Sequence, residues 1–403
     1  MRKRMLALLL ATVLTVPFLA GCGNDAPAEV ADVAPDAVED VVEEVDEVED
    51  AVEDEVDEVV AGTEEVVVRI GWTPPDVTGV WATVSTFMEK AVEDAAQHGI
   101  TIDIVERAPT DHTGIAEQIA TIENFIQQEV DVIMVAPTDV DGVTPALIEV
   151  NQAGIPLIMV NMMSDIEGVD VAAFVGFDNF GSAVVSGWSA IDILGAPGVL
   201  GEGEVVDLPV DTFMDIPFWE DFYADLDHDT ISGRIAIIEG LAGDYFSNAR
   251  VGGFMSVIDQ FPNVEILTVL PGDWNRQVSV DVTENILQNF DDIDIIFAPS
   301  SEMGFGASIA IGNAGLEGEI AVISHGGTME SGEAIRDGRF AAETWHGFPD
   351  WGWYGIKYAV MLALGHDVPD RFDIGARTQW IGNADNFFPY PSLSPIPWGD
   401  MIN

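Results

Sequence analysis

The sequence contains very little cysteine. Its 403 residues include one cysteine, Cys22. A single cysteine excludes an intrachain disulfide, a Cys-x-x-Cys redox site and a cysteine-based zinc site. The six histidines form no His-x-x-x-His or His-Glu-x-x-His pair. We therefore expect neither a metal centre nor a cofactor.

Catalytic signatures are also missing. The sequence has no Gly-x-Ser-x-Gly elbow, no Gly-x-x-x-x-Gly-Lys loop and no Gly-x-Gly-x-x-Gly after its first predicted strand. That strand, Val66–Gly71, runs into Trp72-Thr73-Pro74-Pro75. The two prolines lack the backbone N–H groups that would hold a phosphate. The sequence thus favours a binding protein over an enzyme.

Basic residues are scarce. Lys and Arg together number 14 against 71 Asp and Glu, and only three of the basic residues are lysines. Nineteen acidic and three basic residues precede Val66, which leaves 52 acidic and 11 basic residues and a net charge of −41 in the remainder. Such a surface repels nucleic acid and anionic lipid. One hypothesis is that it suits a salty environment, where salt screens the self-repulsion.

The first 65 residues have the pattern of an export signal followed by a linker. Met1–Arg4 is basic and Met5–Phe18 is apolar but too short for a permanent span. Leu19-Ala-Gly-Cys22 resembles a bacterial lipobox. We expect a signal peptide at 1–21 and a lipidated Cys22 that anchors the protein to the outer face of the cytoplasmic membrane. Residues 22–65, rich in Ala, Val, Asp and Glu, fit either an extended tether or an acidic amphipathic helix.

A strand–helix–strand unit spans Asp131–Asn161. Val132–Val135 is a short apolar run typical of a strand buried on both faces. Apolar residues at helical spacing follow it, Gly154 ends the helix, and Leu157–Val160 forms the next strand. Ligands of parallel sheets bind beyond the C-terminal strand ends, so the loops after Val135 and Val160 are candidate binding loops.

The same alternation occurs in two series, before and after Arg234. This repetition predicts an α/β protein with two doubly wound parallel-sheet lobes. Between the two series, Gly201–Ser232 is acidic, aromatic and irregular, which favours an insertion or surface loop. The last residues, Asn386–Asn403, are rich in Pro and aromatics and predict an extended strap over a lobe or hinge.

Several short motifs occur in order between roughly Val66 and Gly365: Ala136-Pro-Thr-Asp139, Ala153-Gly-Ile-Pro156, Gly176–Gly181, Arg250-Val-Gly-Gly-Phe254, Gly272-Asp-Trp-Asn-Arg276, Phe297–Met303, Gly326-Gly-Thr328 and Asp337-Gly-Arg-Phe340. Together they resemble the type 1 periplasmic binding proteins of the ribose-binding kind, which share their fold with LacI-type ligand domains.

This resemblance implies three hinge crossovers between the lobes. One lobe would comprise residues 66–177 and 348–379, and the other residues 178–347 and 380–403. The implied function is a monomeric extracytoplasmic receptor that binds a small, neutral, sugar-like ligand between the lobes and delivers it to an ABC permease. The alternative is a receptor that signals to a membrane sensor kinase or chemoreceptor without transport.

The candidate binding residues fall into two groups. Aromatic faces that could stack on a sugar ring are supplied by Trp72, Trp81, Trp274 and Trp345. By resemblance, the polar positions of the family fall on Asn161, Asn248, Ser300 and a position next to His325. Asp139 and Asp178 would edge the cleft as well, although each also fits a helix N-cap.

The polar group departs from the family pattern. The resemblance places Asn248 at the position of a ligand-binding arginine and Gly326 at that of an aspartate. Loss of both charges would remove charge-assisted hydrogen bonds. We therefore expect a less polar ligand than ribose, such as a deoxy-sugar, a polyol, a glycoside or a nucleoside.

Overall fold

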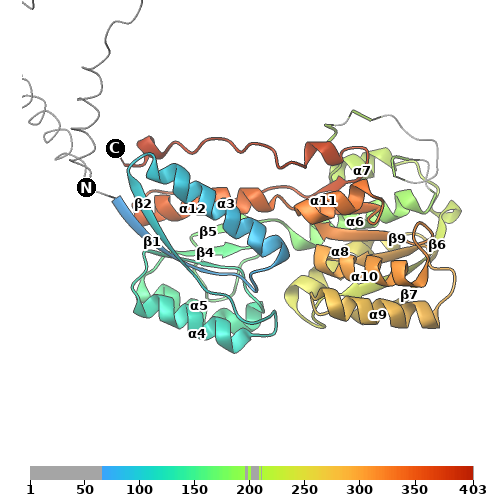
Figure 1. The fold of residues 1–403 in the computed structure, drawn as a ribbon, viewed down its shortest axis with the longest axis horizontal. Helices are drawn as coiled ribbons and strands as arrows, with labels where there is room; N and C mark the ends of the chain where they lie inside the picture. The colour runs from blue at the N-terminus through green and yellow to red at the C-terminus, as the bar shows by residue number, and fades with distance from the viewer. Residues whose placement is uncertain (1–65, 196–197, 201–207, 210, 403) are drawn as a thin grey trace, which may run out of the picture. The chain divides into compact units, whose positions relative to one another are not determined.

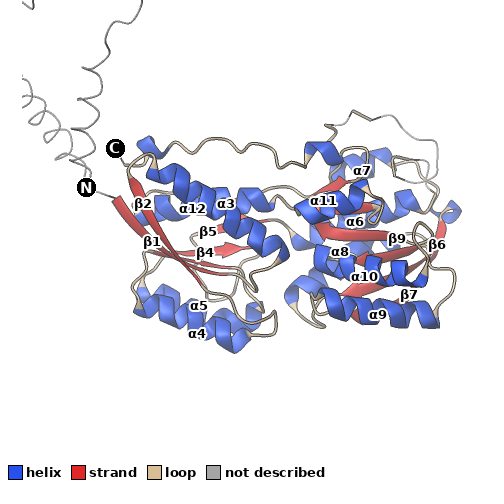
Figure 2. Cartoon of the chain, in the orientation of Figure 1, coloured by secondary structure: helices blue, strands red, loops and turns tan. Residues whose placement is uncertain are grey.

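The computed structural model describes residues 66–402 except 196–197, 201–207 and 210 (Figure 1). The expected signal peptide, the lipidated Cys22 and the acidic linker lie outside the described residues. Within the described residues, no helix is both long enough and apolar enough to cross a membrane. The described chain holds two six-stranded sheets, and each is the centre of one lobe (Figure 2).

The sheet of the N-terminal lobe is entirely parallel, in the order β11-β5-β4-β3-β1-β2. Its strands are β1 (Val66–Thr73), β2 (Ile100–Glu106), β3 (Val132–Val135), β4 (Leu157–Val160), β5 (Ala173–Gly176) and β11 (Arg371–Asp373). The three strands β3, β4 and β5 are buried at every residue, as expected where helices cover both faces of a sheet.

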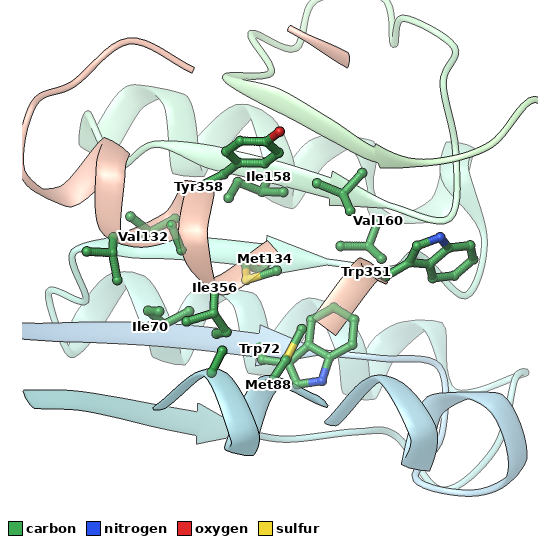
Figure 3. Packing of buried hydrophobic residues seen from close by; sticks show 14 of the residues in the cluster. Ile70, Trp72, Met88, Val132, Met134, Ile158, Val160, Trp351, Ile356 and Tyr358 are labelled. Atoms are coloured by element: carbon green, nitrogen blue, oxygen red, sulfur yellow. The ribbon is translucent and has the colours of Figure 1, made fainter. Parts of the chain in front are cut away.

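Two helix pairs cover this sheet. They are α3 (Gly79–Ala96) with α12 (Phe348–Ala363), and α4 (Ile115–Gln127) with α5 (Val140–Ala153). Figure 3 shows the core under the first pair, in which Met88 and Ile356 pack on Ile70 and Met134 of the sheet. A separate core on the other face includes Phe125, Ile133 and Leu147.

The sheet of the C-terminal lobe has the order β12-β10-β9-β8-β6-β7. All neighbours are parallel except β12, which pairs antiparallel with β10. The strands are β6 (Ser232–Glu239), β7 (Asn263–Pro271), β8 (Ile295–Ala298), β9 (Ala321–Gly326), β10 (Ala342–Trp345) and β12 (Arg377–Gln379). The predicted α/β class with two doubly wound lobes is confirmed.

Helices also cover both faces of the second sheet. One core contains α6 (Asn179–Ile193) and α8 (Tyr245–Ile258), and the opposite core contains α9 (Arg276–Asn289) and α10 (Ser301–Ala314). Helix α11 (Met329–Arg336) precedes β10. The region expected to be irregular, Gly201–Ser232, instead includes the helix α7 (Ile216–Phe222) and the 3₁₀ turn η1 (His228–Thr230), because Trp219 and Tyr223 are buried in the first of these cores.

Asp139 and Asp178 begin helices. The carboxylate of Asp139 accepts a hydrogen bond from Gly142 N at 2.6 Å, and that of Asp178 accepts one from Phe180 N at 3.0 Å. Each satisfies a backbone donor that the helix itself leaves unpaired. Helix α5 ends at Gly154, whose φ of 74° is left-handed, as the sequence predicts.

The chain passes between the lobes four times in its described part. The three expected crossovers lie near residues 177–178, 346–348 and 374–376. The fourth is the C-terminal strap, residues 387–402, which runs along the upper edge of Figure 1. Phe387 and Phe388 pack on Trp345 in the C-terminal lobe, whereas Trp398 is fully buried in the core of the N-terminal lobe.

Two of the expected lobe boundaries differ from the structure, one at β12 and one at the end of the strap. Strand β12 (377–379) hydrogen-bonds to β10, so it belongs to the C-terminal lobe and not to the N-terminal one. The end of the strap belongs to the N-terminal lobe, since Ile396, Trp398 and Met401 join its core and Trp398 Nε1 donates to Asp94 at 2.7 Å.

Candidate ligand-binding site

A cavity lies between the two lobes, at the C-terminal ends of both sheets. Its volume is about 70 Å³, measured as the space open to the centre of a water molecule. The N-terminal lobe contributes the segments after β1, β2, β3 and β4. The C-terminal lobe contributes α8, the end of β9 and the segments after β7 and β8, and the hinge segment after β10 completes the lining. The lining includes Trp81, His112, Asn161, Phe246, Arg250, Trp274, Ser300, Glu302, His325, His346 and Phe348.

Arg250 is the central polar group of this cavity. Its Nε donates to Asn179 Oδ1 at 2.9 Å, and its Nη1 donates to the carbonyl of Pro299 at 2.7 Å. A longer contact of 3.4 Å joins Nη2 to Oδ1 of Asn161 in the other lobe. Burial lowers the pKa of Arg250 to about 10, opposed by Asp244, so the guanidinium stays charged at neutral pH.

Trp274 reaches the cavity from a strained turn. Asp273 and Trp274 have left-handed φ values of 53° and 56°, and Asn275 N closes the turn on the carbonyl of Gly272 at 2.9 Å. The ring is fixed by a hydrogen bond from Nε1 to Asp244 Oδ2 at 3.0 Å. Non-glycine residues in this region are uncommon and cluster at functional sites.

Asn161 is a third left-handed residue at the same cavity, with φ of 71°. Its carbonyl accepts a hydrogen bond from Nδ2 of Asn179 at 2.7 Å. The backbone conformation and this contact together hold the Asn161 side chain, which is 7% exposed, beside the guanidinium of Arg250.

Two neutral histidines form the floor at the hinge. His325 and His346 are 1% exposed and their rings lie 5.1 Å apart. Nε2 of His325 lies 2.6 Å from Ser186 Oγ, whereas its Nδ1 and both nitrogens of His346 have no hydrogen-bond partner in the described part of the chain. Burial lowers the pKa of both well below the usual value, so both imidazoles are neutral, and His325 has one ring nitrogen without a partner whereas His346 has two.

Aromatic rings lie next to the histidines, with Phe348 5.8 Å from His346. Trp81 and Phe348 line the cavity, and Trp351 packs behind both, with its ring 6.2 Å from Trp81 and 4.7 Å from Phe348. His346 is itself stacked on Phe177 at 3.9 Å. These faces could pack on the C–H side of a sugar ring.

The charged side chains at the rim occur as pairs. Nε2 of His112 lies 2.8 Å from Oδ2 of Asp76. Glu302 accepts two hydrogen bonds from Arg276, at 2.8 and 3.0 Å. Although burial opposes it, the contacts with His112 and Thr78 lower the pKa of Asp76. Arg250 thus remains as the one lining cation, among the described residues, without a carboxylate in direct contact.

The two lobes touch at the mouth of the cavity. Ser164 Oγ lies 2.6 Å from the phenol oxygen of Tyr245, and the rings of His112 and Trp274 are 6.5 Å apart. Phe246 of the C-terminal lobe packs into a core of the N-terminal lobe. The lobes are therefore in contact with each other, and both contribute to one site.

The family model described as "Periplasmic binding protein domain" matches residues 70–367. The chain belongs to this family. Membership implies a location outside the cytoplasm.

Curated relatives of this periplasmic binding protein are about one quarter identical to it. The D-allose-binding periplasmic protein of Escherichia coli is 25% identical over 279 residues, which are 68% of this chain and 78% of that protein. The ribose import binding protein RbsB of Bacillus subtilis is 25% identical over 256 residues, 63% of this chain and 69% of that protein.

Solved structures share the fold. A Mycobacterium smegmatis protein in complex with β-D-fucofuranose has a TM-score of 0.64 and 25% identity, covering 80% of this chain and 94% of that one. The fructose-binding periplasmic domain of a hybrid two-component system has a TM-score of 0.62 and 19% identity, covering 79% of this chain and 92% of that one.

The cavity of this periplasmic binding protein brings together five of the ten candidate binding residues. They are Trp81, Asn161, Trp274, Ser300 and His325. Ser300 is also the N-cap of α10, since its hydroxyl accepts a hydrogen bond from Met303 N at 3.2 Å.

The other five candidates lie outside the cavity lining. Trp72 is fully buried in the core of the N-terminal lobe, where its Nε1 donates to Ser85 Oγ at 3.2 Å. Trp345 packs against Phe387 and Phe388 on the strap. Asp139 and Asp178 cap helices, as described above.

Asn248 requires a correction. It lies exposed on α8, where its Nδ2 donates to the carbonyl of Gly243 at 3.0 Å. Asn248 does not line the cavity, whereas Arg250, two residues further along α8, does. Two positions are about 200° apart on a helix, so a shift of two residues exchanges the solvent face for the buried one.

Sequence reasoning also missed functional candidates at the hinge. Neither His346 nor Phe348 is among the ten candidate binding residues, yet both line the cavity. The signal that could have found them is their place directly after β10, at the same sheet edge as His325.

Proposed function

We propose that this protein is an extracytoplasmic receptor for a neutral monosaccharide or a polyol of similar size, which it delivers to an ABC importer. The observation that carries the proposal is the interlobe cavity, which is lined by Arg250, Asn161 and two neutral histidines together with aromatic rings. Such a set combines fixed hydrogen-bond donors and acceptors with apolar faces.

The size of the cavity supports a ligand of monosaccharide size. A water molecule needs roughly 10–15 Å³ of such space, so 70 Å³ corresponds to about five to seven waters. That number is similar to the number of hydroxyl and ring oxygens in one sugar. A nucleoside or a larger glycoside fits this volume less well.

The charges support a neutral ligand. Asp76 and Glu302 at the rim are already paired with His112 and Arg276. The carboxylate of Asp244 interacts electrostatically with Arg250. It also accepts a hydrogen bond from Trp274 Nε1 and caps the N-terminus of α8. A full negative charge on the ligand is therefore not needed to balance Arg250, and its remaining N–H groups suit hydroxyl or ring oxygens.

The relatives point the same way. The curated ones are named for D-allose and ribose, and one solved structure holds β-D-fucofuranose. All three ligands are neutral and rich in hydroxyls. We further propose that lipidated Cys22 keeps the receptor at the membrane, next to its permease, and that it acts as a monomer.

A second candidate function is ligand sensing without transport. It is favoured by the structural similarity to the fructose-binding domain of a two-component system. The genes beside this one distinguish the two functions. Permease and ATPase genes would support delivery, and a sensor kinase gene would support signalling.

The binding proposal is tested by titration calorimetry on the purified chain at low and at molar salt. The panel comprises allose, ribose, fucose, xylitol and inositol, with adenosine as a larger ligand. We expect 1:1 binding of at least one monosaccharide or polyol, tighter than about 10 μM.

The Trp274→Ala variant is expected to weaken that binding at least about tenfold while its unfolding temperature stays close to that of the parent. Absence of binding across the panel at both salt concentrations would contradict the sugar assignment. Tight binding that Trp274→Ala leaves unchanged would contradict the assignment of this cavity.

A further inference from the structure

A second chamber of about 360 Å³ lies at the hinge. It shares no lining residue with the interlobe cavity. Its walls come from the end of β10, the first turns of α12, the crossing between β11 and β12, and residues 391–394 of the strap. Any molecule bound there therefore contacts both lobes.

The strap is held firmly enough to be a wall. Trp353 Nε1 donates to the carbonyl of Ser394 at 3.0 Å, which ties the strap to the N-terminal lobe. Tyr390 Oη donates to the carbonyl of Gly327 at 3.3 Å, which ties it to the C-terminal lobe. The segment 391–394, which lines the chamber, is thus anchored to the C-terminal lobe at Tyr390 and to the N-terminal lobe at Ser394.

Arg377 lines this chamber without an acceptor. Of the nine arginines in the described residues, it is the one whose side chain makes no hydrogen bond and no ion pair with another described residue. Its guanidinium lies instead 4.6 Å from the ring centroid of Phe213 and 5.0 Å from that of Phe387. The rings hold the cation but leave its N–H groups unused.

Asp350 lies on another wall of the same chamber. Burial raises the pKa of its carboxyl to about 6, and Arg377 opposes that rise. The two charges therefore act on each other, yet they form no ion pair and Asp350 accepts no side-chain hydrogen bond from the described residues. Both groups thus line one chamber, and neither uses its side-chain hydrogen-bonding capacity on another described residue.

We propose that the hinge chamber binds a small carboxylic acid that also carries a hydrogen-bond donor, such as an α-amino or α-hydroxy acid. Its carboxylate would meet the guanidinium of Arg377, whose fork matches two carboxylate oxygens. Its ammonium or hydroxyl group would donate to Asp350. Trp345, Tyr354 and Phe372 supply apolar faces for the carbon atoms of the ligand.

The experiment measures binding of L-alanine, L-lactate and acetate to the full chain by calorimetry and by tryptophan fluorescence. Acetate is the matched control because it has the carboxylate but lacks the donor. We expect 1:1 binding of alanine or lactate with a Kd below about 1 mM, and acetate weaker by about tenfold or more.

Two variants separate the roles. Arg377→Gln is expected to weaken binding of the acid by about tenfold or more. Asp350→Ala leaves the contacts of Arg377 with Phe213 and Phe387 in place but removes the acceptor, and we expect it to remove the preference for alanine or lactate over acetate. The proposal is overturned by absence of binding for all three acids up to about 10 mM, or by binding that neither variant changes.

This site is tested separately from the sugar site. Trp274→Ala should leave the binding of alanine and lactate unchanged, and Arg377→Gln should leave sugar binding within about twofold of the parent. Loss of acid binding in Trp274→Ala would place the acid in the interlobe cavity and contradict the hinge assignment. A failure of the sugar panel has no bearing on the acid titration.

Discussion

The phenol oxygen of Tyr245 lies 2.6 Å from the hydroxyl of Ser164, across the mouth of the interlobe cavity. Tyr245 belongs to α8 in one lobe, and Ser164 follows β4 in the other. The hydrogen bond therefore exists only while the lobes are closed. Tyr245→Phe removes it but keeps the ring that packs edge-on against Phe246 at 5.1 Å. Since a hydrogen bond contributes ~0.5–1.5 kcal/mol, we expect ligand dissociation to be about two- to tenfold faster in stopped-flow fluorescence.

The matched control is Ser164→Ala, which removes the other partner of the same hydrogen bond. It should speed dissociation by a similar factor, and the double variant should add little to either single change. Fully additive effects would show that the two hydroxyls do not act on each other in the closed form.

Variants of Arg250 and Asn248 test which face of α8 contributes to ligand binding. Arg250→Lys keeps the charge but loses the planar fork that bonds Asn179, Pro299 and Asn161. We expect ligand affinity, measured by calorimetry, to fall by about tenfold or more. Asn248→Ala lies on the exposed face of the same helix and should change the affinity less than about twofold. Equal losses in both variants would contradict the assignment of Arg250.

The strained turn before Trp274 can be relaxed by a single substitution. Asp273→Gly places a residue without a Cβ at φ of 53°, so we expect the free energy of unfolding to rise by up to about 1 kcal/mol. Because the turn also positions Trp274, ligand affinity should fall. Glu129→Gly, at φ of 51° and far from the cavity lining, is the control that should raise stability without changing affinity. Chemical denaturation and calorimetry measure the two quantities.

Glu343 predicts a specific pH dependence. It is 1% exposed, accepts hydrogen bonds from Ser301 and Ser324, and burial raises its pKa from 4.5 to about 7. Between these values the folded protein keeps a proton that the unfolded chain releases. Stability should therefore increase as the pH falls from 8 to 5, by a few kcal/mol (~3) for this group.

Glu343→Gln should remove that component, so the two unfolding free energies should differ most at pH 8, with the variant the more stable. His325 and His346 act in the opposite direction, because their lowered pKa values make acid destabilising, but they contribute equally to both proteins. Parallel pH profiles for the parent and the variant would contradict a raised pKa for Glu343.

Asp139 separates a capping role from a binding role. Asp139→Ala removes the acceptor for Gly142 N, so we expect a loss of about 1 kcal/mol in stability. Ligand affinity should stay within about twofold, because Asp139 does not line the cavity. A large loss of ligand affinity at unchanged stability would show that Asp139 is a binding residue.

The fold could be predicted from the sequence because its signals are local. The apolar runs at 132–135 and 157–160 cannot be anything but buried strands once Asp139 and Gly154 mark the two ends of the helix between them. Repetition of this pattern on both sides of Arg234 then determined the number of lobes. Such signals depend on a few neighbouring residues and not on distant contacts.

The site was only partly predictable because it depends on contacts far apart in the chain. Trp72 and Trp81 lie nine residues apart and both belong to the core of the N-terminal lobe, but only Trp81 also lines the cavity. Trp81 packs on Trp351 of α12, 270 residues later in the chain, and such a contact is not visible in the local sequence. The choice of Arg250 over Asn248 likewise depends on which face of α8 meets α6, which no local pattern in so weakly amphipathic a helix reveals.

The fourth crossing has a mechanical consequence. The described body starts at Val66 in β1 and ends with Trp398 and Met401 in the core beside the same sheet. Both ends of the body are thus fixed to a single lobe, and the other lobe is an insertion without a free end. A load applied through the two ends would pass through the first lobe alone. The lobe that carries Arg250 and Trp274 can then swing without moving either point of attachment.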